Sequence, residues 1–165
     1  MATPTLKGNL VNLMGMIPEI GDQAKNFTAI KQDLTEFTLD DYHGKKKILN
    51  ISPSIDTEVC ANSVRIFNQK IANLDNVVVI YLSMDLPFAH KRFCAGEGIK
   101  NVVTGSLFRD SDFINNYGLL MMDSPLKGLL ARAVLVLNEN NQIIHLELVS
   151  EITNEPNYQA ALDVI

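Results

Sequence analysis

The chain has 165 residues, of which 47% are hydrophobic and 20% are charged. This length supports a buried core without metals or disulfides. The 14 basic against 19 acidic residues leave a formal net charge of −5, and the one basic run, residues 45–47, is too short for a nucleic-acid surface. No segment approaches the roughly 18 apolar residues of a membrane span, and residues 1–25 lack the pattern of a signal peptide. We therefore expect a soluble, cytoplasmic protein with one domain over residues 1–165.

Three short apolar segments near the start of the chain, residues 10–13, 27–30 and 37–39, predict small strands of an N-terminal β-hairpin extension. Two longer apolar runs follow at residues 47–52 and 77–84 and are typical of strands buried on both faces. The residues between these runs carry an apolar stripe with helical spacing, formed by Val64, Phe67, Ile71 and Leu74. Strand, helix and strand in this order predict a parallel pair with a right-handed crossover.

The second half of the chain continues the alternation of helices and strands. The predicted elements are a helix capped by Asp85 and ending near residue 95, a short strand at 102–103, a short helix at 112–117, an antiparallel hairpin of strands 133–137 and 143–149, and a last helix capped by Asn154. This order predicts an α/β protein with the thioredoxin-like fold, in which a central mixed sheet is flanked by helices.

Cys60 follows the first long strand and lies in the first turn of the predicted helix, with Asp56 or Thr57 as the N-cap. Unpaired N–H groups and the helix dipole favour an anion at this position, so a cysteine there favours its thiolate form. The hydroxyl of Thr57, on the same helical face, would donate to the sulfur or to a molecule bound beside it. The alternative is an inert core cysteine that continues the apolar stripe.

Arg132 is unusual among the arginines because it lies within an apolar strand segment, LLARAVL at residues 129–135. A guanidinium keeps its charge, and its burial is costly unless an anion or several acceptors meet it. Arg132 therefore needs a partner, which is either a functional anion or the carboxylate of a structural salt bridge.

Cys94 is the only other cysteine and follows His90 by one helical turn. If Cys60 were oxidised to a sulfenic acid, a second thiol within reach would condense with it to a disulfide. The bridge requires Cα atoms within about 7 Å, so the two helices would have to open locally. The chain has no Cys-x-x-Cys pair, no metal-binding spacing and no phosphate-binding glycine motif, so we expect no metal and no cofactor.

Pro53, Thr57 and Cys60 form the pattern Pro-x-x-x-Thr-x-x-Cys, which resembles the motif of the peroxiredoxins. A narrower resemblance, to the bacterial thiol peroxidases, covers nearly the whole chain. It is carried by PSIDTEVC at 53–60, SMDLPFAHKRFC at 83–94, GLLARAVLVLNEN at 128–140 and EITNEP at 151–156.

The resemblance implies that Cys60 is the peroxidatic cysteine, Cys94 the resolving cysteine, Arg132 and Thr57 the residues that position peroxide, and Pro53 a shield for the thiolate. It also implies a cofactor-free homodimer, recycled by thioredoxin, that reduces hydrogen peroxide and organic hydroperoxides in antioxidant defence. The apolar residues 121–130 would contribute to the substrate pocket. Two other functions compete with this one: a binding or chaperone-like module with structural cysteines, and a general thiol–disulfide exchanger.

Overall fold

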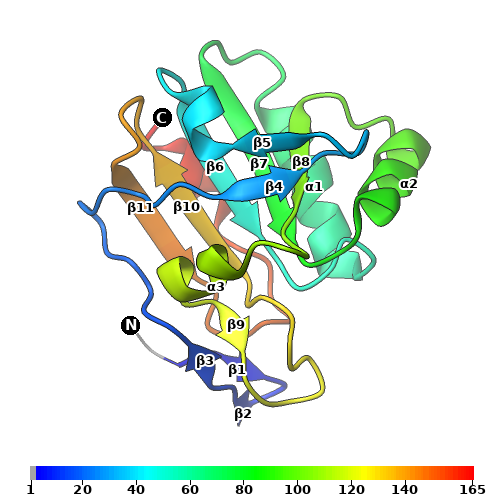
Figure 1. Ribbon diagram of the computed structural model, residues 1–165, viewed down its shortest axis with the longest axis vertical. Coiled ribbons are helices and arrows are strands. Elements are labelled where there is room, and N and C mark those ends of the chain that lie inside the picture. Colours follow the sequence, from blue (N-terminus) through cyan, green and yellow to red (C-terminus); the bar gives the residue numbers. More distant parts are fainter. Residues whose placement is uncertain (1–2) are drawn as a thin grey trace.

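The computed structural model describes residues 3–165, and its centre is a seven-stranded mixed sheet (Figure 1). Strands β6, β7 and β8 are parallel, β10 is antiparallel to β6, and β11 is antiparallel to β10. The order across the sheet is β11 (Ile143–Leu148), β10 (Ala133–Leu137), β6 (Lys46–Ile51), β7 (Val77–Ser83), β8 (Val102–Ser106), β4 (Thr28–Ile30) and β5 (Glu36–Thr38). This arrangement confirms the predicted mixed sheet and the predicted C-terminal hairpin.

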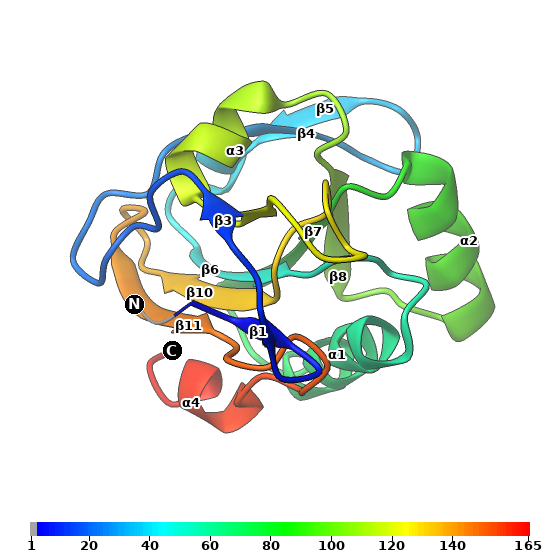
Figure 2. The same ribbon diagram turned by 90° about the horizontal axis from the view of Figure 1, so that it is seen from below.

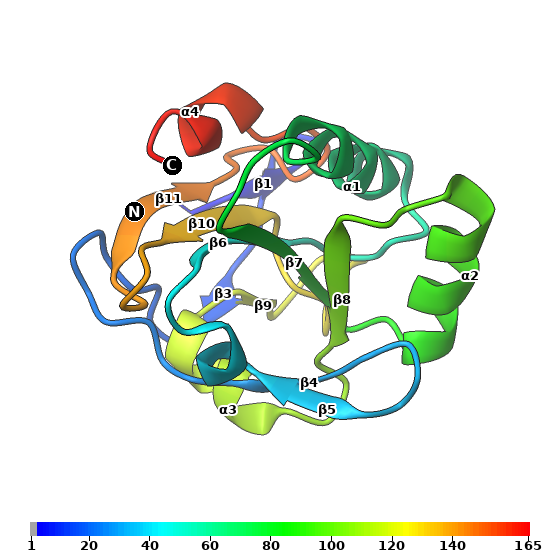
Figure 3. The same cartoon turned by 90° about the horizontal axis from the view of Figure 1, so that it is seen from above.

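Helices cover both faces of the sheet. Figures 2 and 3 show α1 (Glu58–Lys70) and α4 (Tyr158–Leu162) on one face, and α3 (Ser111–Tyr117) on the other. Helix α2 (Pro87–Glu97) lies beyond β8 in the same views, and a 3-10 helix, Leu39–Tyr42, follows β5. The thioredoxin-like plan of helices around a mixed sheet is therefore present.

The strands divide the core because successive side chains point to opposite faces. In β6, Ile48 packs in the cluster that contains Val64 and Phe67 of α1, whereas Leu49 packs in the cluster that contains Phe113 of α3. The continuous apolar run thus reflects burial on both faces of β6, as expected for an inner strand.

The N-terminal segment forms a hairpin from β1 (Thr5–Leu6) and β2 (Asn9–Leu10), which lies earlier in the chain than the predicted strands. The strand predicted at 10–13 is wrong as one element, because only its two ends belong to strands, β2 and β3 (Leu13–Met14). Strand β3 pairs with β9 (Leu120–Met121). This pair is not predicted from the sequence. The segments predicted at 27–30 and 37–39 contribute β4 and β5, which join one edge of the main sheet.

Three other local predictions were wrong. Helix α1 ends at Lys70, so Leu74 lies beyond it and is 44% exposed. Leu86, and not Asp85, occupies the N-cap of α2, because the Asp85 carboxylate accepts hydrogen bonds from Ser54 and Ile55 instead. The cap of α4 is Asn157, since the backbone at Asn154 closes a turn by donating to the Glu151 carbonyl. Within residues 3–165, every helix is too short or too polar to cross a lipid bilayer.

Candidate active site

Cys60 lies in the first turn of α1, and Thr57 caps this helix as one of the two predicted residues. The Thr57 hydroxyl accepts a hydrogen bond from the Cys60 N–H at 3.4 Å and donates to the Ser54 carbonyl at 3.1 Å. Because its single proton is used by the Ser54 carbonyl, this hydroxyl does not donate to the sulfur in this arrangement. It instead orders the turn that presents Cys60. Donation to a molecule bound beside the sulfur, the other part of the expectation, stays a prediction.

Arg132 precedes β10 and is only 3% exposed. Its Nη1 lies 3.3 Å from Cys60 Sγ, and its Nε donates to the Ile152 carbonyl at 3.0 Å. No carboxylate of residues 3–165 lies within ion-pair distance of Arg132, whereas the other arginines pair with acids: Arg65 with Glu97, Arg92 with Asp56 and Arg109 with Glu36. The salt-bridge alternative is therefore wrong, and the sulfur occupies the place where the guanidinium needs an anion.

The Cys60 side chain is fully buried. Two tyrosines from other elements are close enough that a charge on Cys60 raises their pKa values. Burial raises the pKa of Tyr81, on β7, well above its usual value, and a Cys60 charge raises it further. Burial also raises the pKa of Tyr158, on α4, with smaller contributions from Glu155 and Cys60. Both phenols therefore stay neutral beside the sulfur. Neither tyrosine is predicted from the sequence, since only tertiary packing brings them here.

Pro53 is buried in the segment that joins β6 to α1. It lies seven residues before Cys60, at the first position of the pattern, and it has no N–H group to compete for the acceptors of the turn. This position is compatible with the shielding that the sequence predicts.

Cys94 lies on α2, is 6% exposed and, like Cys60, is a free thiol. Burial raises the pKa of Cys94, although a hydrogen bond with Gln32 opposes this effect. Two ion pairs connect α2 to α1 and to the segment before it: Arg65–Glu97 at 2.9 Å and Arg92–Asp56 at 2.6 Å. In this arrangement Cys94 is a buried thiol whose raised pKa favours the neutral form.

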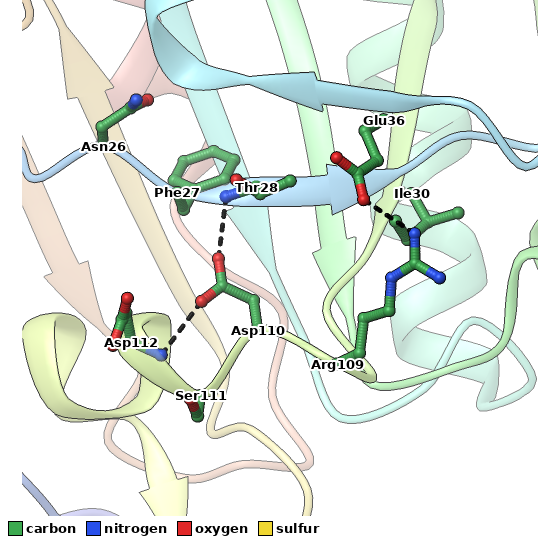
Figure 4. A pocket seen from close by; sticks show the side chains of 9 residues that line it. All are labelled: Asn26, Phe27, Thr28, Ile30, Glu36, Arg109, Asp110, Ser111 and Asp112. Atoms are coloured by element: carbon green, nitrogen blue, oxygen red, sulfur yellow. Dashed lines mark hydrogen bonds and ion pairs between the residues drawn. The ribbon is translucent and has the colours of Figure 1, made fainter.

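A separate cavity of about 440 Å³ lies between β4, β5 and the start of α3 (Figure 4). Asp110 accepts from the backbone N–H groups of Thr28 at 2.8 Å and Asp112 at 3.0 Å, and Arg109 pairs with Glu36 at 2.8 Å. None of the lining residues drawn there is a cysteine or a histidine. The cavity therefore offers no thiol chemistry that would compete with Cys60.

Comparison with known proteins agrees with a thiol-based site on this fold. Residues 19–162 match the family described as Redoxin. A curated thiol peroxidase from Leptospira interrogans is 54% identical over 164 residues, which cover 98% of this chain and 96% of the relative. The chain therefore belongs to the Redoxin family, and within it to the peroxiredoxins of the thiol peroxidase group.

Two solved structures extend the comparison. A peroxiredoxin-like protein from Aquifex aeolicus has a TM-score of 0.93 at 39% identity, over 98% of this chain and 94% of its own. A thiol peroxidase from Chromobacterium violaceum has a TM-score of 0.90 at 18% identity, with the same coverage of 98% and 94%, and supports the fold alone. The chain is thus a thiol-dependent peroxidase with a thioredoxin-like fold.

Proposed function

We propose that this peroxidase reduces hydrogen peroxide and organic hydroperoxides through a sulfenic acid on Cys60 and an intramolecular disulfide with Cys94, which thioredoxin then reduces. The observation that carries the proposal is the 3.3 Å contact of Arg132 Nη1 with Cys60 Sγ, made by a buried guanidinium that has no carboxylate partner among residues 3–165. The pair combines a nucleophile with a fixed positive charge at one point.

In the first step the Cys60 thiolate attacks the terminal peroxide oxygen. The S–O bond forms as the O–O bond breaks, and the departing alkoxide or hydroxide takes up a proton to leave as alcohol or water. Arg132 stabilises the charge that moves onto the leaving oxygen. Thr57 fixes the turn, so that the N–H groups at the start of α1 face the same charge, and Pro53 helps to exclude water.

In the second step the Cys94 thiolate attacks the Cys60 sulfenic acid, forms the S–S bond and releases hydroxide, which is protonated to water. A dithiol then reduces the bridge by exchange. Because burial raises the pKa of Cys94, the second step requires α2 to open, since solvent exposure restores the reactive thiolate.

The apolar residues 121–130 support the inclusion of organic hydroperoxides. Leu126 and Leu129 pack in one cluster with Ile152, whose carbonyl binds Arg132. An alkyl group beside Arg132 would therefore meet apolar side chains. We further propose that residues 1–165 act as one catalytic domain, as a homodimer in the cytoplasm, and that the reaction needs no metal or cofactor.

Replacement of each cysteine tests the proposed roles of Cys60 as the nucleophile and of Cys94 as its disulfide partner. Cys60→Ser should abolish thioredoxin-dependent peroxide consumption, because the nucleophile is lost. Cys94→Ser should complete one turnover, seen as about one equivalent of peroxide consumed and a 16 Da increase in intact mass, and then stop with thioredoxin as reductant. Full activity of Cys60→Ser would overturn the assignment.

Two other outcomes of the same experiment point to the competing functions. A binding module with structural cysteines predicts no mass change when the parent protein meets peroxide. A general thiol–disulfide exchanger predicts that the oxidised protein forms only with disulfide donors, and that peroxide is not consumed.

A further inference from the structure

The Asp85 carboxylate joins the entrances to the two cysteine-bearing helices. Its Oδ1 accepts from the Ser54 hydroxyl at 2.7 Å, and its Oδ2 accepts from the Ile55 N–H at 2.7 Å and the Ser83 hydroxyl at 2.6 Å. Ser54 and Ile55 lie in the segment that leads into α1, whereas Ser83 ends β7 shortly before α2 begins. One side chain therefore ties both entrances together.

On the α1 side the hydrogen bonds continue to Cys60. The Ser54 carbonyl accepts from the Thr57 hydroxyl at 3.1 Å and from the Thr57 N–H at 3.2 Å, and the Thr57 hydroxyl accepts from the Cys60 N–H. The turn that holds Cys60 beside Arg132 is thus fixed at its start by Asp85.

On the α2 side the bonds continue to the turn before Cys94. Ser83 Oγ lies 2.8 Å from Nε2 of His90, which is completely buried. Ser83 has one hydroxyl proton, which it gives to Asp85, so His90 donates through Nε2–H. Its Nδ1, buried and without a partner among the described residues, is then the unprotonated nitrogen. His90 precedes Cys94 by about one helical turn.

We propose that Asp85 is a positioning residue that keeps Cys60 in its reactive place beside Arg132 and delays its encounter with Cys94. The proposal rests on the peroxidase mechanism above. Both thiols are buried and unbonded to each other in this arrangement, so disulfide formation requires α1 and α2 to leave the positions that Asp85 ties together. The carboxylate therefore sets the balance between the peroxide step and the disulfide step.

A longer-lived sulfenic acid has a measurable consequence. A second peroxide molecule can oxidise it to a sulfinic acid, with transfer of one oxygen and release of a second alcohol or water. Weakening the contacts of Asp85 should therefore slow the first oxidation, speed disulfide formation, and lower the fraction of sulfinic acid at high peroxide.

Three variants remove the contacts in graded steps. Ser54→Ala removes the hydrogen bond to Asp85 and also the one that Ser54 Oγ accepts from the Asp56 N–H at 3.2 Å. Asp85→Asn removes the charge but keeps the shape, and Asp85→Ala removes all three bonds of the carboxylate. A hydrogen bond to a charged group is worth about tenfold or more in an equilibrium constant, so Ser54→Ala should speed disulfide formation about tenfold, with a larger effect in Asp85→Ala.

Two rates are measured by rapid acid quench and intact mass: sulfenic acid formation in a Cys94→Ser background, and disulfide formation after one equivalent of peroxide in the two-cysteine protein. Asp56→Asn is the matched control, because it removes the exposed ion pair with Arg92 that spans the same two segments. This variant should change each rate by less than about twofold, since exposed pairs contribute little. Gly118→Ala changes the end of α3, on the opposite face of the sheet from α1 (Figure 2), and controls for lowered stability.

The result expected is a split, in which sulfenic acid formation slows while disulfide formation accelerates. The proposal is overturned if both rates stay at parent values in Ser54→Ala and Asp85→Asn, or if Gly118→Ala produces the same split. Either outcome leaves the peroxidase assignment intact, because that assignment is tested separately, by Cys60→Ser and by the reaction of the parent protein with peroxide.

Discussion

Arg132 holds two acceptors at once, the Ile152 carbonyl through Nε and Cys60 Sγ through Nη1. A lysine in its place keeps the positive charge but loses the planar fork that reaches both acceptors. We expect Arg132→Lys to lower the rate of Cys60 oxidation by about 10² to 10³, the usual cost of losing a donor to a developing oxyanion. The measurement is sulfenic acid formation in a Cys94→Ser background.

Arg109→Lys is the matched control for this substitution. Arg109 is an exposed arginine that pairs with Glu36, so its variant should oxidise at the parent rate. Equal rates for Arg132→Lys and the parent would show that a point charge suffices and that the fork is not needed.

At the same scale, the sequence predicts residues whose signals are local and misses those whose partners are remote. The sequence predicts Thr57 as one of two possible caps because a cap and the N–H group that it binds, here that of Cys60, are only three residues apart. The sequence predicts Asp85 as the cap of the nearest helix, but its carboxylate oxygens accept hydrogen bonds from Ser54 and Ile55, about 30 residues earlier. Tyr81 and Tyr158 come near Cys60 only after the sheet and α4 have packed.

At the scale of elements, helices α2 and α3 end in the same way but in different surroundings. Gly98 ends α2 with φ 65° and Gly118 ends α3 with φ 66°, both in the left-handed region. An added Cβ meets nothing within 4 Å at Gly98, whereas at Gly118 it lies 2.5 to 2.8 Å from backbone atoms of Met16 and Ile17. The N-terminal segment therefore passes directly against the end of α3.

This difference predicts that replacement by alanine lowers the free energy of unfolding by unequal amounts at the two glycines. Gly98→Ala should lower the free energy of unfolding by about 1 to 2 kcal/mol, the cost of the left-handed conformation alone. Gly118→Ala should lower it by about 1 to 3 kcal/mol more, because backbone atoms must move. Chemical denaturation of the two variants checks the difference, and equal costs would contradict the close contact at Gly118.

The strands show the same limit of local information. Strand β10 has the predicted bounds, because its five successive apolar residues are all buried and indicate a strand from the sequence alone. Strands β3 and β9 have two residues each, too few for a periodic pattern, and they pair with each other across more than 100 positions of the chain. Their register is decided by packing against the rest of the molecule.

At the scale of the whole molecule, the buried His90 makes stability depend on pH. Burial lowers the pKa of His90 to about 4, and this effect outweighs the attraction of Asp85 and Asp56, the two acids that raise it. Tyr81 packs edge-on against the imidazole, Ser83 accepts its Nε2–H, and the Asp85 carboxylate lies 3.8 Å from Nε2, beyond hydrogen-bond distance. The folded protein therefore holds His90 neutral, whereas the unfolded chain protonates it below about pH 6.5.

Between about pH 6.5 and 4 the unfolded state binds one more proton than the folded state at this site, so the free energy of unfolding should fall as the pH falls. Chemical denaturation at pH 7.5 and pH 5 measures the loss. His90→Gln keeps a donor for Ser83 but does not titrate, so its loss over this interval should be smaller than that of the parent. His43 is exposed, so between pH 7.5 and pH 5 the His43→Gln variant should lose as much free energy of unfolding as the parent. An unchanged loss in His90→Gln would mean that His90 takes up its proton over the same pH range in the folded protein as in the unfolded chain. The neutral imidazole that donates its Nε2–H to Ser83 at pH 5 would then be wrong.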